Sequence, residues 1–268
     1  MRLLICVNWL RRLDQRGVTM VELIVVMVMT LIFTGIISNF MIGYWRYSAL
    51  LEADLTTLST RLNAGDFIRE NIATSTGLVS QNSIPDNNPG LADSTISSGL
   101  FWQPIHAIPG NKPIGGNGVK TPLVYYRRPS LDASKAFIMN GTQPYEDEFI
   151  YYLDGSTKSL MQRTLANPNA VGNRVKTSCP PSSATASCPA DKTIATDLAS
   201  IDMRYFSRAG NLINYTSIVD STTGNYIGPD FTAVEVVEFN INLTKKPFLQ
   251  QTNATQNSTI IRVALRNA

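Results

Sequence analysis

Apolar residues gather in one long run near the start of the chain. No charged residue occurs from Leu23 to Trp45, and a carboxylate, Glu22, directly precedes this run. About 20 helical residues span the hydrocarbon core of a bilayer, so the run is long enough to cross a membrane. Because a carboxylate is costly at the edge of a lipid core, we expect Glu22 to have a partner and a function.

Beyond this run, apolar residues recur at helical spacing while charged residues lie off the stripe. The stripe consists of Leu51, Leu55, Leu58, Leu62, Ile68 and Ile72. The pattern predicts one continuous helix from about Val18 to about Thr74, and we expect the stripe in its second half to lie against a globular domain.

The rest of the chain alternates between turn-rich segments and short runs of β-branched and aromatic residues. The expected strands cover residues 100–108, 122–128, 148–155, 159–166, 201–215 (as two strands around Gly210), 233–246 and 259–267. The segment "DGSTK" between two of them predicts a hairpin. The chain is therefore expected to be an α+β protein, with a long helix packed on a single domain built on an antiparallel sheet.

The distribution of charge along the chain bears on whether it binds nucleic acid. The net charge of the 268 residues is +3, but the excess lies in residues 1–17, which contain four arginines and one aspartate. Outside this segment the basic and acidic side chains balance. No cluster of Lys and Arg with interleaved aromatic residues is visible, so nucleic-acid binding is not inferred.

The segment "RGVTMVEL" resembles the processing site of type IV prepilins and pseudopilins. The resemblance implies that a prepilin peptidase cleaves between Gly17 and Val18 and that the new N-terminus is methylated. Glu22 is then the fifth mature residue, where the family has a glutamate that pairs with the N-terminal ammonium of a neighbouring subunit. One departure is Val18, because the family usually has phenylalanine there.

This resemblance divides the chain into four parts. Residues 1–17 are the leader peptide, residues 18–45 the transmembrane and assembly helix, residues 46–76 its amphipathic continuation, and residues 77–268 an extracytoplasmic β-rich domain. Arginines precede the apolar run and no comparable basic cluster follows it, so the N-terminus is expected in the cytoplasm. The expected location is the inner membrane, in a single pass, and then a filament.

Two other readings of the N-terminal segment remain open. A cleaved secretory signal has a shorter apolar core of about 7–15 residues and a small-residue cleavage site. A plain signal anchor explains the length and the arginines, but it has no use for Glu22 or Gly17.

The C-terminal part, with "DLASIDMRYFSRAGN" and "AVEVVEFNINL", is similar to minor pilins of the PilW type and to J-type minor pseudopilins. This similarity implies a structural subunit that helps to initiate or tip a type IV pilus or a type II secretion pseudopilus. The implied partners are prepilin peptidase, other pilin or pseudopilin subunits bound through the N-terminal helix, and inner-membrane lipid. Alternatives are an anchored adhesin or binding module that does not polymerise and, more weakly, an anchored hydrolase.

Cys179 and Cys188 frame the short loop "CPPSSATASCP", whereas Cys6 lies in the leader. Two thiols this close are easily joined in an oxidising compartment, and we expect a disulfide between them; two unrelated surface thiols are the alternative. A zinc site is disfavoured because the chain has one histidine, His106, and no CxxC pair.

No catalytic motif stands out, so we expect neither enzymatic activity nor a cofactor. His106, which lies close to a proline within the strand expected at residues 100–108, is expected to be structural or solvated. The acidic run Glu146, Asp147 and Glu148 has oxygen ligands that suit calcium. In a strand, however, consecutive side chains point to alternate faces, so we expect no metal site there but a solvated strand entry.

Overall fold

The computed structural model describes residues 19–87, 96–97, 101–102, 112–113, 120–213, 218–219, 226–227, 234–245 and 255–265. The predictions for Gly17, Val18 and His106 therefore lie outside the described residues. The chain forms two compact units, Met1–Leu51 and Glu52–Ala268. Helix α1, Met20–Ala73, begins in the first unit and ends in the second. Its bounds agree closely with the predicted helix.

In the first unit, the described residues are a coil residue, Thr19, and the first part of helix α1. This part is long and apolar enough to cross a membrane. Its threonine hydroxyls are satisfied within the helix, because Thr30 donates to the carbonyl oxygen of Val26 and Thr34 to that of Thr30, both at 2.7 Å. Such bonds remove the cost of placing a hydroxyl in an apolar environment.

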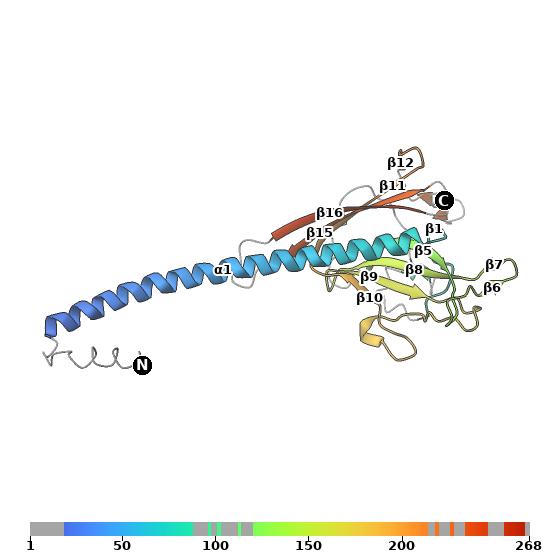
Figure 1. Cartoon of the computed structure of the whole chain (residues 1–268). Coiled ribbons are helices and arrows are strands. Elements are labelled where there is room, and N and C mark those ends of the chain that lie inside the picture. The colour runs from blue at the N-terminus through green and yellow to red at the C-terminus, as the bar shows by residue number, and fades with distance from the viewer. Residues whose placement is uncertain are drawn as a thin grey trace, which may run out of the picture. The chain divides into compact units, whose positions relative to one another are not determined.

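The second unit contains two larger antiparallel sheets (Figure 1). One has the strand order β1-β5-β8-β9-β10 and the other β12-β11-β15-β16, with β4 also paired to β11. Their strands are β1 (Gly77–Val79), β4 (Lys112–Pro113), β5 (Lys120–Pro129), β8 (Glu146–Asp154), β9 (Ser159–Leu165), β10 (Lys192–Ala195), β11 (Leu198–Phe206), β12 (Leu212–Ile213), β15 (Val236–Lys245) and β16 (Thr255–Ala264). The α+β class is confirmed, but two sheets replace the single sheet that was expected.

Smaller elements complete the second unit. Three short hairpins are formed by β2 (Ile96–Ser97) with β3 (Phe101–Trp102), β6 (Met139–Asn140) with β7 (Gln143–Pro144), and β13 (Ile218–Val219) with β14 (Tyr226–Ile227). A 3₁₀ helix, η3 (Pro181–Ser183), lies in the loop between the two cysteines of the second unit. The strand expected at residues 100–108 is represented by β3, and its remaining residues lie outside the described ranges.

The predicted hairpins are present. Strands β8 and β9 pair antiparallel around the segment "DGSTK". There Asp154 accepts a hydrogen bond from the backbone N–H of Ser156 at 2.9 Å, which closes an Asx turn. Strands β11 and β12 pair around Gly210, whose φ of +78° lies in the left-handed region that glycine adopts without strain. Strand β15 pairs with β16 over its full length.

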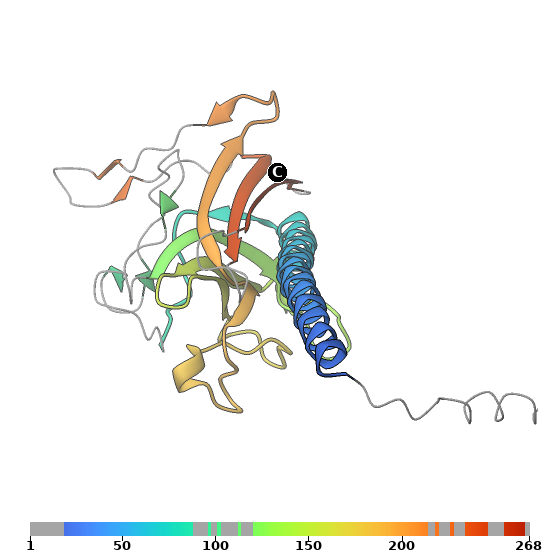
Figure 2. The ribbon, with the colours of Figure 1, turned by 90° about the vertical axis from the view of Figure 1, so that its left-hand side faces the viewer.

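The second half of helix α1 packs through small residues rather than through the predicted leucine stripe. Both sheets lie to one side of this half of the helix (Figure 2). Its buried residues are Ala53, Thr57, Ala64, Gly65, Ile68, Asn71 and Ile72. Ile68 and Ile72 are buried as predicted, but the four leucines, Leu51, Leu55, Leu58 and Leu62, are exposed. The prediction for the leucines is wrong.

The reason is the distance between the helix and strand β16. A Cβ atom placed on Gly65 would lie 3.5 Å from Cδ1 of Ile261. Small side chains allow this close approach, which a leucine at the same position would prevent. The helix therefore presents its small residues to the sheet, and its leucines lie on another face.

Candidate functional site

The described residue that precedes helix α1 forms a reciprocal cap with the third residue of the helix. The backbone N–H and the hydroxyl of Thr19 each donate to Oε2 of Glu22 at 2.9 Å. In return the backbone N–H of Glu22 donates to the Thr19 hydroxyl at 3.3 Å. This is a capping box, in which two backbone N–H groups that have no partner within the helix are both satisfied.

The cap gives Glu22 a local role that the sequence analysis missed. A carboxylate in the first turn also interacts favourably with the positive end of the helix dipole. The signal was present as a threonine followed three residues later by a glutamate. The other carboxylate oxygen, Oε1, has no hydrogen-bond partner among the residues that the structure describes. One oxygen of Glu22 thus holds the cap, and the other is available to a second group.

Apart from Thr19, the described residues nearest to Glu22 in the sequence are apolar. The helix from Val21 to Tyr47 exposes nearly every large apolar side chain in the isolated chain. An apolar surface of this length is covered by lipid or by other protein. Gly17 and Val18, the residues predicted at the processing site, lie outside the described ranges, so their place relative to Glu22 stays a prediction.

The acidic run at the start of β8 is not a solvated strand entry, and that prediction is wrong. Asp147 is 1% exposed, and its Oδ1 accepts hydrogen bonds from the Ser130 hydroxyl, the Asn167 backbone N–H and the Asn173 amide at 2.7–2.9 Å. Burial raises the pKa of the Asp147 carboxyl above its ordinary value, although these three donors oppose the shift.

Glu148 lies on the other face of β8 and is also 1% exposed. Its carboxylate accepts from the backbone N–H groups of Ser83 and Ile84 at 2.7 and 2.9 Å, and from Nε of Arg127 at 2.9 Å. Because these oxygens already bind N–H donors, they are not arranged for calcium. Within the described ranges, no group of three or more His, Cys, Asp or Glu side chains is placed to hold a metal ion.

A buried charge cluster that the sequence did not reveal lies between β9, β10 and the segment after β1. Arg163 is fully buried, with its Nε 3.3 Å from Oδ1 of Asp191 and 3.5 Å from Oδ2 of Asp86. Trp102 donates its indole N–H to Asp86 at 2.9 Å, and Tyr152 donates its hydroxyl to Asp191 at 2.7 Å. These contacts hold the loop segments on the sheet, and they have the character of a structural core rather than of a catalytic site.

The predicted disulfide between Cys179 and Cys188 is present, with the two Cα atoms 5.5 Å apart. It lies beside the charge cluster. The hydroxyl of Ser178 donates to Asp191 at 2.6 Å, and the carbonyl oxygen of Ser178 accepts from Arg163 at 2.5 Å. The disulfide therefore fixes a segment that supplies two hydrogen bonds to the buried charges.

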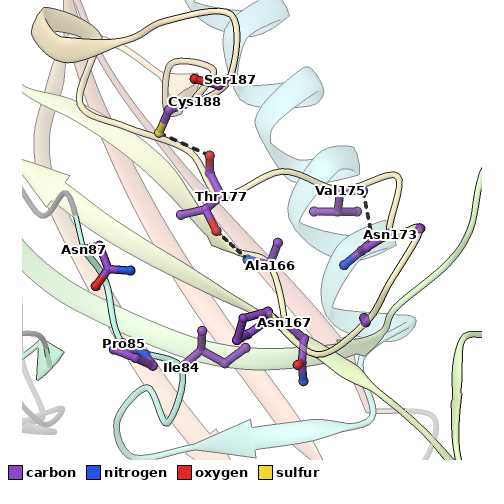
Figure 3. A pocket seen from close by; sticks show the side chains of 13 residues that line it. Ile84, Pro85, Asn87, Ala166, Asn167, Asn173, Val175, Thr177, Ser187 and Cys188 are labelled. Carbon is purple, nitrogen blue, oxygen red and sulfur yellow. Dashed lines mark hydrogen bonds between the residues drawn. The ribbon is translucent and has the colours of Figure 1, made fainter.

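A pocket of about 520 Å³ lies next to this disulfide (Figure 3). Its lining includes Ile84, Pro85, Asn167, Asn173 and Thr177 and contains no charged side chain. Three polar side chains of the lining are already engaged, since those of Asn167 and Asn173 cap neighbouring backbone N–H groups and Thr177 accepts from the N–H of Ala166. The pocket therefore presents few free groups with which to bind a polar ligand.

Comparison with known proteins connects the N-terminal end of helix α1 to a family. Residues 12–38 match the family described as the prokaryotic N-terminal methylation motif. No curated protein matches the chain, and no solved structure matches it. The motif and the apolar helix support a type IV pilin-like prepilin, anchored in a membrane through this helix. The family that carries the motif is structural rather than enzymatic.

Proposed function

We propose that the chain is a minor pilin or minor pseudopilin, of the PilW type or the related J type. It is a structural subunit that helps to initiate or tip a type IV pilus or a type II secretion pseudopilus. The observation that carries the proposal is Glu22, a carboxylate at the start of a membrane-length apolar helix and five residues after Gly17, inside a match to the methylation motif. A plain anchor has no use for Gly17, and the capping box with Thr19 engages only one oxygen of the Glu22 carboxylate.

Processing comes first in the proposed mechanism. The chain lies in the inner membrane with its arginine-rich leader in the cytoplasm. The part of the second unit that follows helix α1, which we call the β-rich unit, lies outside. Prepilin peptidase cleaves after Gly17, and the amine of Val18 becomes the methylated N-terminus. Before assembly, the capping box with Thr19 gives the Glu22 carboxylate hydrogen-bond donors within its own chain, which lowers the cost of holding it near lipid.

Assembly then supplies Glu22 with a charge partner. When helices of neighbouring subunits pack in the filament, the N-terminal ammonium of one subunit pairs with Glu22 of another. In a medium of low dielectric constant such a pair is much stronger than in water, and an unpaired charge is strongly disfavoured. The carboxylate therefore sets the axial register of the subunit in the filament.

The test compares two substitutions on the same helix. Glu22→Val removes the docking carboxylate, and Glu52→Gln removes an exposed carboxylate beyond the apolar run. Both variants should be cleaved, so mass spectrometry should find each mature chain beginning at Val18 with a methylated amine. Only Glu22→Val should be absent from sheared filaments, because the neighbouring ammonium is then buried without a partner.

Two results would overturn the proposal. Normal incorporation of Glu22→Val would mean that the carboxylate is not the docking group. A mature N-terminus near residue 40 would instead indicate a secretory signal. Gly17→Leu serves as the processing control and should leave the leader attached.

A further inference from the structure

The leucines that the sequence assigned to the domain interface form an exposed surface instead. Leu55, Leu58 and Leu62, which we call the leucine seam, lie in the second unit and are 65%, 43% and 58% exposed. They lie on one face of helix α1, because residues three and four apart are neighbours on a helix. The same spacing extends back to Leu51 in the sequence.

The β-rich unit does not cover the leucine seam. That unit packs against Ala53, Thr57, Ala64 and Ile68, which are buried. At 3.6 residues per turn, the centre of this buried face lies about 140° around the helix from the centre of the seam. The centres of the seam and of the buried face therefore lie on different sides of the helix.

Lipid does not cover the seam either. At about 1.5 Å per residue, the seam begins about 15 Å and ends about 25 Å beyond Trp45, the last residue of the charge-free run. Arg46, Glu52 and Asp54 lie between Trp45 and the seam. Charged side chains at this depth indicate water rather than hydrocarbon. Three leucines on one helical face in water predict a protein partner.

The spacing of the leucines identifies the kind of partner. Leu51, Leu55, Leu58 and Leu62 follow one another at intervals of four, three and four residues, which is the a/d pattern of a coiled coil. We infer that the leucine seam binds the leucine seam of a second copy of this chain, in a parallel, in-register pair of helices. The inference rests on the proposed function only in taking the first half of α1 as a membrane anchor, which makes the two helices parallel.

The charges beside the seam fit pairing with an identical helix. With Leu55 and Leu62 at a positions, Arg61 occupies a g position and Asp66 the following e position. In a parallel pair these two positions face each other across the two helices. Arg61 is half-buried, and the Asp66 side chain is 80% exposed. The pair therefore brings Arg61 of each copy towards Asp66 of the other.

The leucine seam is short, and anchoring of both helices in one membrane compensates for the weak binding that this implies. Two heptads bind weakly between free helices in solution. When both helices are held in one membrane, contact between the two seams becomes effectively intramolecular. The local concentration of one seam around the other then reaches the millimolar range for short connections. We therefore expect pairing of the full chain in membranes.

Cysteine cross-linking of the full chain in membranes tests the inference. The background is Cys6→Ser, and the native disulfide is kept. Leu58→Cys places a thiol at a d position, whereas Thr56→Cys places one on an exposed site about 160° around the same helix. After mild oxidation, Leu58→Cys should give a covalent dimer of twice the chain mass, and Thr56→Cys should not. No dimer from Leu58→Cys, equal dimer from both variants, or a cross-link to a different protein would overturn the inference.

A second variant shows whether the leucines drive the pairing. Leu58→Glu, combined with Leu62→Cys as the reporter, should reduce the dimer at least about tenfold relative to Leu62→Cys alone. Because Leu58 is exposed, the thermal unfolding of the β-rich unit should not change, which excludes misfolding. An unchanged dimer yield would show that the leucines do not form the contact.

The mature N-terminus of the same samples separates this inference from the proposed function. A chain that begins at Val18 and enters filaments but gives no dimer leaves the proposed function intact and removes only the pairing. A chain that forms the dimer but does not begin at Val18 overturns the proposed function while the pairing stands.

Discussion

Replacing Arg163 by methionine would test how strongly the buried charge cluster stabilises the β-rich unit. Arg163 is fully buried between Asp86 and Asp191, with its Nε 3.5 and 3.3 Å from their carboxylate oxygens. Methionine is long and apolar, so it fills much of the space of the side chain without leaving a large cavity. The substitution therefore removes the charge and its hydrogen bonds while keeping most of the volume.

The expected loss is about 3–5 kcal/mol in the free energy of unfolding, which is the usual cost of removing one partner from a buried ion pair. Two features place Arg163→Met in this range. Two buried carboxylates, not one, lose their guanidinium, and the carbonyl oxygen of Ser178 loses a donor at 2.5 Å. The guanidinium also lies 5.9 Å from the ring centre of Trp102, a cation–π contact that methionine lacks.

The loss should depend on pH with a definite sign. Burial already raises the pKa of Asp191 above its ordinary value, although Arg163 opposes the shift. Without Arg163 the pKa of Asp191 in the folded state rises further. The Asp191 carboxyl then binds a proton more readily in the folded state than in the unfolded state. The free energy of unfolding therefore falls as pH rises through the interval between the two pKa values, and it recovers as pH falls. Arg163→Met should therefore be most destabilising near neutral pH and less so towards pH ~4.

Urea titration of the mature chain in detergent micelles measures this loss. Trp102 is buried in the β-rich unit, and Trp45→Phe in both proteins leaves it as the single tryptophan of the predicted mature chain. Arg69→Met is the matched control, because Arg69 is 63% exposed and 3.9 Å from an exposed carboxylate. It should cost less than about 1 kcal/mol. Equal losses for the two variants, or a loss for Arg163→Met that does not change with pH, would refute the argument from buried charge.

Two further predictions concern the stability of the same unit. Reduction of the Cys179–Cys188 bond, which closes a loop with a sequence separation of 9, should lower the unfolding free energy by about 2.5–3 kcal/mol in the chain-entropy model; an unchanged urea midpoint after complete reduction would contradict it. Gly65→Ala should raise the unfolding free energy by about 0.5–1 kcal/mol through helix propensity, because the added Cβ would lie 3.5 Å from Cδ1 of Ile261, an ordinary contact. Gly65→Leu should do the opposite, and a lower midpoint for Gly65→Ala would mean that the helix cannot accept a methyl group there.

Local patterns predicted the elements that depend on neighbours in sequence. Helix α1 follows from an uninterrupted apolar run that continues at helical spacing, and the hairpin of β8 and β9 follows from a polar turn between two apolar runs. The closeness of Cys179 to Cys188 in the sequence was sufficient to predict their bond. In each case the residues that determine the structure lie within a few positions of each other.

Predictions failed where the deciding partner lies far away in the sequence. The periodicity of helix α1 identified an apolar face, but Ile261 on strand β16 decides that the small residues around Gly65 face the sheet. Asp147 was assigned to solvent because its donors, among them Ser130 and Asn173, lie 17 and 26 residues away. Arg163 gave no signal, since neither Asp86 nor Asp191 is near it in the chain.

The bond between Cys179 and Cys188 also affects the order in which the domain is completed. It holds Ser178, which donates to Asp191 and accepts from Arg163, and Asp191 itself donates its backbone N–H to the carbonyl oxygen of Cys179 at 2.8 Å. Disulfides form in compartments that oxidise thiols and not in the reducing cytoplasm. In the proposed orientation, with both sheets outside the cytoplasm, a newly made chain lacks this bond until the loop has been exported. Export, rather than synthesis, is then the step after which the charge cluster reaches its full stability.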